Sequence, residues 1–217
     1  MPLRHRLSRY LLALPGSIAF CLRYLPLRQA VRLPILIARP FSRTHMGGSV
    51  RIEGPVRPGM IKIGFGWASL FDWRRERGVW VAPGEVVFEG PAEIFHGARL
   101  SIEGRLVLGA NVNLSSDCRI NCMREISIGA DTKISWSTLV MDSDLHAIDG
   151  RDPHAPVSIG EHVLIGANAI VLKGVRVPDG VIVAAGSCLT RSTAIAPREL
   201  VAGNPARVVR SGVSWER

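Results

Sequence analysis

The stretch "PVSIGEHVLIGANAIVLKGVRVPDGVIVAAGSCLTRS", residues 156–192, repeats every six residues. Its aliphatic side chains follow that spacing throughout: Ile159, Ile165, Val171, Val177, Val183 and Leu189. Small or β-branched residues come four positions after these aliphatics: Val163, Ala169, Val175, Val181 and Ser187. A period of six fits neither the 3.6-residue repeat of an α-helix nor the two-residue alternation of a hairpin strand. The stretch therefore predicts a chain that forms a short strand, turns by about 120° and repeats.

Three six-residue units are expected to close one triangular coil. The strands of each coil then pair in parallel with those of the next coil, at a spacing of roughly 4.8 Å. A single coil cannot bury its own apolar face, so several coils must stack and both ends need caps. The same phase continues upstream at Ile102, Leu108, Leu114, Ile120, Ile128, Ile134 and Val140. The one spacing of eight, between Ile120 and Ile128, predicts a two-residue bulge near Met123 and Arg124. We therefore predict an all-β fold, a parallel β-helix of hexapeptide repeats over residues 46–192, followed by a short C-terminal tail at 193–217.

Charge is distributed unevenly along the 217 residues. Residues 1–43 contain eight arginines and no acidic residue, which leaves 19 basic and 18 acidic side chains in the rest of the chain. The net charge of +9 therefore belongs to the N-terminal segment and does not indicate a nucleic-acid partner. The four cysteines form no Cys-x-x-Cys pair, so we expect a reduced, cytoplasmic protein with free thiols.

Residues 1–45 are predicted to form one or two amphipathic helices, broken near Pro15, Pro26 and Pro34. Leu3, Leu7, Leu11 and Leu14 share one helical face. The uncharged run at 10–22 is shorter than the roughly 20 residues that span a bilayer. A helix rich in arginine and leucine can lie on an anionic membrane, here the inner face. The alternative is that the segment packs on the main domain or on a neighbouring subunit.

The repeat at 156–192 and the sequence "ELVAGNPARVVR" at 199–210 resemble the hexapeptide-repeat acyltransferases, in particular their maltose/galactoside O-acetyltransferase-like branch. The resemblance covers residues 50–210. It implies a left-handed parallel β-helix, a homotrimer, and transfer of an acetyl group from acetyl-CoA to a hydroxyl, often on a sugar. It implies no requirement for a metal.

The stretch "LVMDSDLHAIDGRDPHAPVSIG", residues 139–160, interrupts the period. Counting sixes from Ile128 leads to His146, where an inward aliphatic is expected. An ionisable histidine is costly to bury in an apolar interior. We therefore predict that the chain leaves the coil here, with a loop at 147–156 and His146 at a corner. His154 is predicted to have no catalytic role.

The resemblance implies that His146 is the general base for the acceptor hydroxyl, although the family's histidine matches Leu145, one residue earlier. Asp142 and Asp144 are candidates to orient His146 or to bind the acceptor, and a turn-forming role is equally open. Asp117 lies near the acceptor position of the family. The resemblance places six residues along acetyl-CoA: Ala167, Ala185, Thr190, Arg191, Arg207 and Arg210.

A further break in the period, at 65–91, contains Trp67, Trp73 and Trp80, which either pack against the coil or line an acceptor cleft. A membrane-facing N-terminus favours a lipid-linked or polysaccharide-precursor sugar as acceptor. The alternatives are a non-catalytic scaffold, an N-acyltransferase of an amino sugar, and a γ-carbonic-anhydrase-like metal enzyme. Zinc in the last class needs a His-x4-His pair, whereas the histidines at 146, 154 and 162 are spaced by eight.

Overall fold

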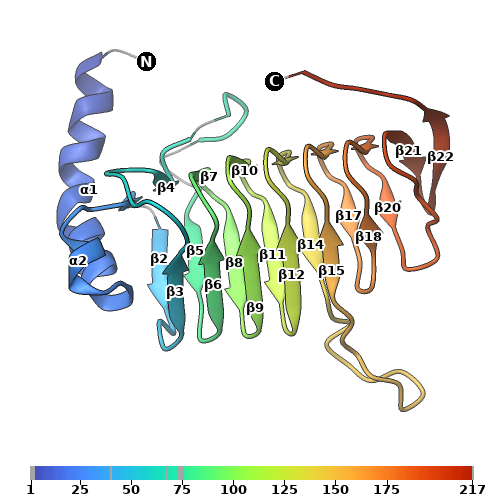
Figure 1. Cartoon of the computed structure of the whole chain (residues 1–217), viewed down its shortest axis with the longest axis horizontal. Coiled ribbons are helices and arrows are strands. Elements are labelled where there is room, and N and C mark those ends of the chain that lie inside the picture. The colour runs from blue at the N-terminus through green and yellow to red at the C-terminus, as the bar shows by residue number, and fades with distance from the viewer. Residues whose placement is uncertain (1–2, 40, 67, 73–75, 217) are drawn as a thin grey trace.

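Three β-sheets enclose one interior in the computed structural model of the chain (Figure 1). The structure describes residues 3–39, 41–66, 68–72 and 76–216, with side chains from residue 8 onward. From residue 35 to residue 189, every third strand along the chain joins the same sheet, so each turn of the chain adds one strand to each sheet. The fold is therefore the predicted parallel β-helix of hexapeptide repeats, with a helix at its N-terminal end.

The sheets have nine, seven and six strands. The nine-stranded sheet contains, in spatial order, β1 (Ile35–Ile37), β4 (Ile61–Ile63), β7 (Ala92–Ile94), β10 (Val112–Leu114), β13 (Lys133–Ile134), β16 (Leu164–Ile165), β19 (Ile182–Val183), β21 (Glu199–Gly203) and β22 (Ala206–Ser211). The seven-stranded sheet contains β2 (Phe41–Thr44), β5 (Gly78–Val81), β8 (Arg99–Ile102), β11 (Arg119–Cys122), β14 (Leu139–Met141), β17 (Ile170–Val171) and β20 (Cys188–Leu189). The six-stranded sheet contains β3 (Ser49–Ile52), β6 (Glu85–Phe88), β9 (Arg105–Leu108), β12 (Glu125–Ile128), β15 (Val157–Ile159) and β18 (Arg176–Val177). The named strands pair in parallel except for β21 with β22, which are antiparallel.

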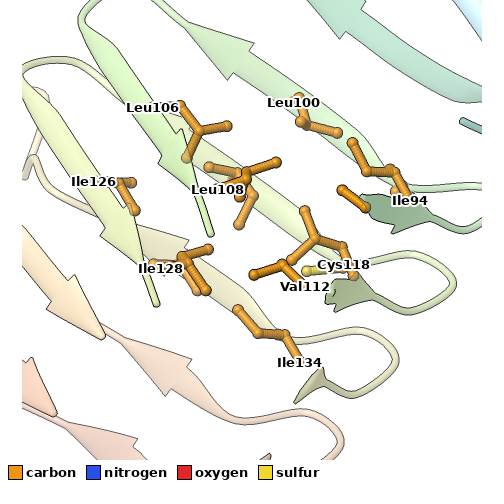
Figure 2. Close-up of a cluster of buried hydrophobic side chains, with 14 of the residues drawn as sticks. Ile94, Leu100, Leu106, Leu108, Val112, Cys118, Ile126, Ile128 and Ile134 are labelled. Carbon is orange, nitrogen blue, oxygen red and sulfur yellow. The ribbon is translucent and has the colours of Figure 1, made fainter. Parts of the chain in front are cut away.

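The hexad aliphatics form the interior, as predicted. Ile165, Val171 and Val183 are at most 1% exposed. Figure 2 shows the same inward arrangement for Ile94 and Leu108 in the earlier coils. Alternate residues of each strand point inward because side chains alternate between the faces of a sheet, and parallel pairing stacks them into continuous apolar ladders.

The coils have two lengths. In the N-terminal half, Arg99 pairs with Arg119, and stacked positions are 20 apart along the chain. In the C-terminal half, Ile170 pairs with Cys188, and stacked positions are 18 apart. We call these the long coils and the short coils. The two extra residues of a long coil lie where the chain passes from the seven-stranded to the six-stranded sheet, and the predicted bulge at 123–124 is one such place.

The same extra pair also occurs at residues 103–104, where the spacing gave no sign of it. The reason is that each long coil has one additional inward position, occupied in turn by Ala82, Ile102 and Cys122. Ile102 lies six residues before Leu108 and so imitates the hexad, although Leu100 is the inward residue that corresponds to Ile120.

The N-terminal end of the β-helix is covered by α1 (Leu3–Tyr24), which is followed by α2 (Leu27–Ala30) (Figure 1). Ser17 and Cys21 of α1 are buried against β1. The Ser17 hydroxyl accepts the N–H of Ile37 at 2.9 Å, and the Cys21 thiol donates to the carbonyl oxygen of Ile35 at 3.4 Å. These bonds satisfy edge groups of the first coil, so α1 acts as the cap that a β-helix requires.

Two features of the N-terminal segment differ from the prediction. The helix α1 continues through Pro15 because Pro15 is exposed and tertiary packing of the opposite face holds the helix together. The first strands, β1 and β2, begin before residue 45 and pair with β4 and β5.

The structure also describes most of the predicted C-terminal tail at 193–217 and one of the three tryptophans in the break at 65–91. Residues 199–211 form β21 and β22, which extend the nine-stranded sheet. Trp80 is fully buried and packs edge-on against Phe20 at 5.3 Å, which is the packing role. Trp67 and Trp73 lie outside the described residues.

Candidate active site

The predicted loop leaves the β-helix between β14 and β15 and projects away from the coils (Figure 1). Its neck is closed by an antiparallel bridge between Ser143 and His154. The N–H of Asp144 also donates to the carbonyl oxygen of Pro153 at 2.9 Å. Beyond the neck, His146 is exposed, as the break in the ladder predicted. The imidazole is therefore accessible to a substrate while the backbone that carries it is anchored.

Asp142 anchors the neck on the coil side. Its side chain is fully buried and occupies the additional inward position that Cys122 fills one coil earlier. One carboxylate oxygen accepts the N–H of Met123 at 2.7 Å, and the other accepts those of Arg124 and Glu125 at 2.8 and 2.7 Å. These charge-assisted bonds are among the stronger hydrogen bonds in proteins.

The previous coil shows why a carboxylate is needed at this point. There the N–H groups of residues 103 and 104 donate to the carbonyl oxygen of Cys122, at 2.8 and 3.1 Å, and the N–H of Arg105 donates to Arg124 at 3.0 Å. The N–H groups of residues 123–125 have no such carbonyls above them, because the chain turns away into the loop. The Asp142 carboxylate takes the place of these carbonyls, which prevents three partly buried donors from being left unpaired.

Asp144 has a different partner. Its carboxylate forms an ion pair with Lys173 at 2.6 Å, and Lys173 also donates to the carbonyl oxygen of Asp152 at 3.2 Å. Arg124 meets the Asp152 carboxylate at 3.5 Å. Both candidate aspartates are thus occupied by groups other than His146, and their contacts position the loop through its backbone. Lys173 and Arg124 were not singled out from the sequence, although Lys173 follows β17 at the same corner where Asp142 follows β14.

A groove of about 780 Å³ lies beside the loop, over the six-stranded sheet. It is lined by Ala155 and Pro156 of the loop and by two arginines, Arg176 and Arg191. The Arg191 side chain passes over Gly174, where a Cβ would lie 3.1 Å from its Cδ atom. Of the predicted donor residues, Thr190 and Arg191 thus lie on the loop edge, which is the edge between the seven- and six-stranded sheets. Arg176 is an additional cation that the sequence did not indicate.

The other predicted donor residues lie elsewhere. Ala167 and Ala185 are neighbours in adjacent coils, with the carbonyl of Ala167 accepting the N–H of Gly186 at 2.8 Å. They belong to the edge between the nine- and seven-stranded sheets. Arg207 and Arg210 are exposed on β22. The predicted residues of one chain therefore do not converge on a single point.

Asp117 lies on the same edge as Ala167, two coils earlier. Its carboxylate forms ion pairs with Arg99 and, at 3.0 Å, with Arg119, and it accepts the Ser137 hydroxyl at 3.1 Å. These contacts fix the corner between β10 and β11.

Two further histidines, His96 and His162, have structural contacts. Nδ1 of the buried His96 lies 3.0 Å from the carbonyl oxygen of Gly66, to which it donates, and burial lowers the pKa of His96. Its Nε2 has no hydrogen-bond partner among the described residues. His162 stacks on Trp215 at 4.5 Å. Within the described part of the chain, no three His, Cys, Asp or Glu side chains come together as a potential metal site.

Comparison with known proteins gives matches of two kinds. Residues 156–191 match the family model described as the hexapeptide repeat of succinyl-transferase. A 2,3,4,5-tetrahydropyridine-2,6-dicarboxylate N-acetyltransferase of Staphylococcus aureus strain JH9 is 50% identical over 56 residues, which cover 26% of this chain and 23% of that protein. The alignment thus spans about a quarter of the curated relative's length.

Solved structures match over a longer range at lower identity. The polySia specific acetyltransferase NeuO aligns with a TM-score of 0.60 and 17% identity over 82% of both chains. A point mutant of AntD, an N-acyltransferase from Bacillus cereus in complex with dTDP and coenzyme A, aligns with a TM-score of 0.50 and 18% identity, over 82% of this chain and 80% of that one. The chain therefore has the fold of hexapeptide-repeat β-helix proteins, and its residues 156–191 carry the repeat itself.

Proposed function

We propose that the chain is an acetyl-CoA-dependent O-acetyltransferase that moves an acyl group to a hydroxyl of a sugar, with His146 as the general base. The observation that carries the proposal is the loop of residues 142–156, in which a buried carboxylate anchors the neck and a histidine is left exposed. The hexapeptide repeat at 156–191 and the resemblance to acyltransferases support the same class of reaction. The maltose/galactoside branch stays a prediction.

The chemistry is a direct transfer. A neutral ring nitrogen of His146 takes the proton of the acceptor hydroxyl while the oxygen attacks the thioester carbonyl, and the electron pair moves to the carbonyl oxygen. The tetrahedral intermediate collapses, the carbon–sulfur bond breaks, and the imidazolium returns its proton to the departing thiolate. A positioned base contributes typically 10²–10⁴-fold to such a reaction, and backbone N–H groups of the coil can stabilise the oxyanion.

The groove on the loop edge suits the acyl donor. Arg176 and Arg191 offer guanidinium groups for phosphate oxygens, and the groove leads along Ala155 towards the neck of the loop. Asp142 serves as a positioning residue, because it holds the backbone from which His146 projects. Asp144 has the same role through Lys173.

A homotrimer completes this proposal. Ala167 and Ala185, the predicted contacts for the donor arm, lie on a different edge of the chain from His146, on the other side of the seven-stranded sheet. A second copy placed edge to edge brings its Ala167 edge against the first copy's loop. Such a heterologous contact closes into a ring when the rotation allows it, and a triangular prism with three parallel copies suits a three-fold axis.

The second candidate function is N-acylation of an amine, such as an amino sugar. It is favoured by the S. aureus relative, an N-acetyltransferase that is 50% identical over the aligned segment. An amine with its lone pair free does not need the base for attack, so it predicts a smaller effect of removing His146.

A thiol-release assay with acetyl-CoA, run with matched hydroxyl and amino sugars, tests the proposal. We expect His146→Ala to lose about 10²–10⁴-fold in kcat on a hydroxyl acceptor while its affinity for coenzyme A stays unchanged in titration calorimetry. His162→Ala, which removes another exposed histidine outside the loop, is the matched control and should keep its rate. Full activity of His146→Ala would rule out this base, and absence of coenzyme A binding by the wild type would favour a scaffold.

A further inference from the structure

The helix α1 is apolar on two sides. Its inner side, with Phe20 and Cys21, is buried against the first coil. From residue 8 to residue 22, its exposed residues are all uncharged, and only the first is polar: Ser8, Leu11, Leu12, Pro15, Ile18, Ala19 and Leu22. The four large side chains among them are 47–58% exposed. A helix on the surface of a soluble protein normally carries charged residues on its outer side, so this outer face is built to be covered.

The apolar face continues beyond α1. Leu27 and Val31, in and just after α2, are 68% and 71% exposed. An apolar hollow of about 310 Å³ opens next to Leu11 and is lined by Tyr10, Leu11, Leu14, Leu33, Leu36, Pro58 and Gly59. We call the outward residues of α1 together with Leu27 and Val31 the N-terminal apolar face. Because α1 lies across the end of the β-helix (Figure 1), this face points away from the stack of coils and is separate from the loop edge.

The same segment carries five exposed arginines and no acidic residue. Arg23, Arg28, Arg32, Arg39 and Arg43 are all exposed, and the first acidic residue of the chain is Glu53. Arg23 and Arg43 donate to the carbonyl oxygens of Met46 and Gly16, at 2.7 and 3.1 Å, which holds these side chains at the rim. The surface therefore combines an apolar centre with a fixed positive border.

We propose that the N-terminal apolar face lies on an anionic lipid bilayer. A bilayer interface offers an apolar layer for the leucines and negative headgroups for the arginines. A second copy docked face to face would oppose arginine to arginine, which is unfavourable. No helix in the described part of the chain is long and apolar enough to cross a membrane. The chain would therefore lie on the membrane surface, and the stack of coils would extend away from the bilayer.

This inference does not rest on the proposed transferase activity, and it is tested with point variants of the full chain. Deletion of residues 1–43 would be ambiguous, because it removes buried core residues together with β1 and most of β2. The apolar variant is Leu11→Gln/Ile18→Gln/Leu22→Gln, and the charge variant is Arg28→Gln/Arg39→Gln. The control is Leu70→Gln, which changes a side chain that is 74% exposed outside this face. Thermal unfolding checks that each variant folds.

The measurement is co-sedimentation with vesicles of phosphatidylcholine alone or mixed with phosphatidylglycerol. We expect the wild type to prefer the mixed vesicles, the charge variant to bind them about 30-fold more weakly at about five-fold per arginine, and the apolar variant to lose at least about ten-fold. Leu70→Gln should bind as the wild type does. Equal binding to both vesicle types, or unchanged binding of the apolar variant, would overturn the proposal. A lipid-free oligomer that only the apolar variant disrupts, with no vesicle binding, would assign the face to a second copy instead.

Discussion

The N-terminal and C-terminal coils solve the same packing problem with different lengths. The long coils, such as the one from Arg99 to Arg119, have an additional inward position between the seven- and six-stranded sheets. The short coils, such as the one from Ile170 to Cys188, have none. The ladder of additional positions runs through Ala82, Ile102 and Cys122 and ends at Asp142. His146 thus belongs to the loop that begins where the coil length changes.

The change of length explains why the loop can be anchored at that point. A wider coil stacked on a narrower one leaves N–H groups without carbonyls above them, and here these are the groups of residues 123–125. A carboxylate on the departing chain satisfies all three. The Asp142 side chain therefore both accepts these N–H groups and holds the backbone that carries His146.

The largest expected effect, on the free energy of unfolding, comes from removing the Asp142 carboxylate. Asp142→Ala leaves three donors unpaired at a partly buried corner, and each unpaired buried donor costs about 1–3 kcal/mol. We expect the free energy of unfolding to fall by about 3–5 kcal/mol. Urea unfolding followed by circular dichroism measures it.

Asp144→Ala is the matched control for this variant. It removes a carboxylate two positions away, whose ion pair with Lys173 is partly exposed, so we expect a loss of at most about 1 kcal/mol. Equal destabilisation by the two variants would contradict the view that Asp142 closes a mismatch between coils.

A smaller effect is expected at His96, in the N-terminal half. Burial lowers the pKa of His96 in the folded chain, whereas an unfolded histidine titrates near pH 6.5. Below that pH the unfolded chain binds a proton that the folded chain does not, so stability decreases as the pH falls. We expect the melting temperature of the wild type to drop between about pH 7.5 and about pH 5.5.

His96→Asn separates this titration from simple loss of contacts. The amide can still donate to the carbonyl of Gly66, but it does not titrate, so the pH dependence of the melting temperature should become shallower although the protein is less stable near neutral pH. His162→Asn, at an exposed position, should keep the wild-type slope. A His96→Asn variant with an unchanged slope would assign the acid sensitivity to other groups.

The extent to which sequence could predict this molecule follows the same division. The short coils obey the hexad without exception, so the fold and the departure near His146 could be predicted from spacing. The bulge at residues 103–104 of the long coils could not be predicted from spacing, because Ile102 keeps the hexad spacing to Leu108. The partners of Asp142 and Asp144 could not be predicted, since they depend on which backbone groups a coil of different length leaves exposed. The continuity of α1 through Pro15 depended on tertiary packing, which outweighs local propensity.

The smallest effect concerns thiol reactivity. It compares buried cysteines of the long coils with an outward cysteine of the short coils. Burial raises the pKa of Cys118 and Cys122, both in the long coils, to about 12, and it also raises the pKa of Cys21. At about pH 8 a thiol whose pKa is about 12 is thiolate in about one molecule in 10⁴.

Cys188 lies on the outward side of β20 in the short coils and is half-buried. We therefore expect N-ethylmaleimide to modify Cys188 first in the native protein, as measured by mass spectrometry of intact protein and peptides. Denaturant should make all four thiols react, which provides the control for reagent and detection. Modification of Cys122 as fast as Cys188 would mean that the additional inward position is open to solvent, and the ladder that ends at Asp142 would then not be a sealed part of the interior.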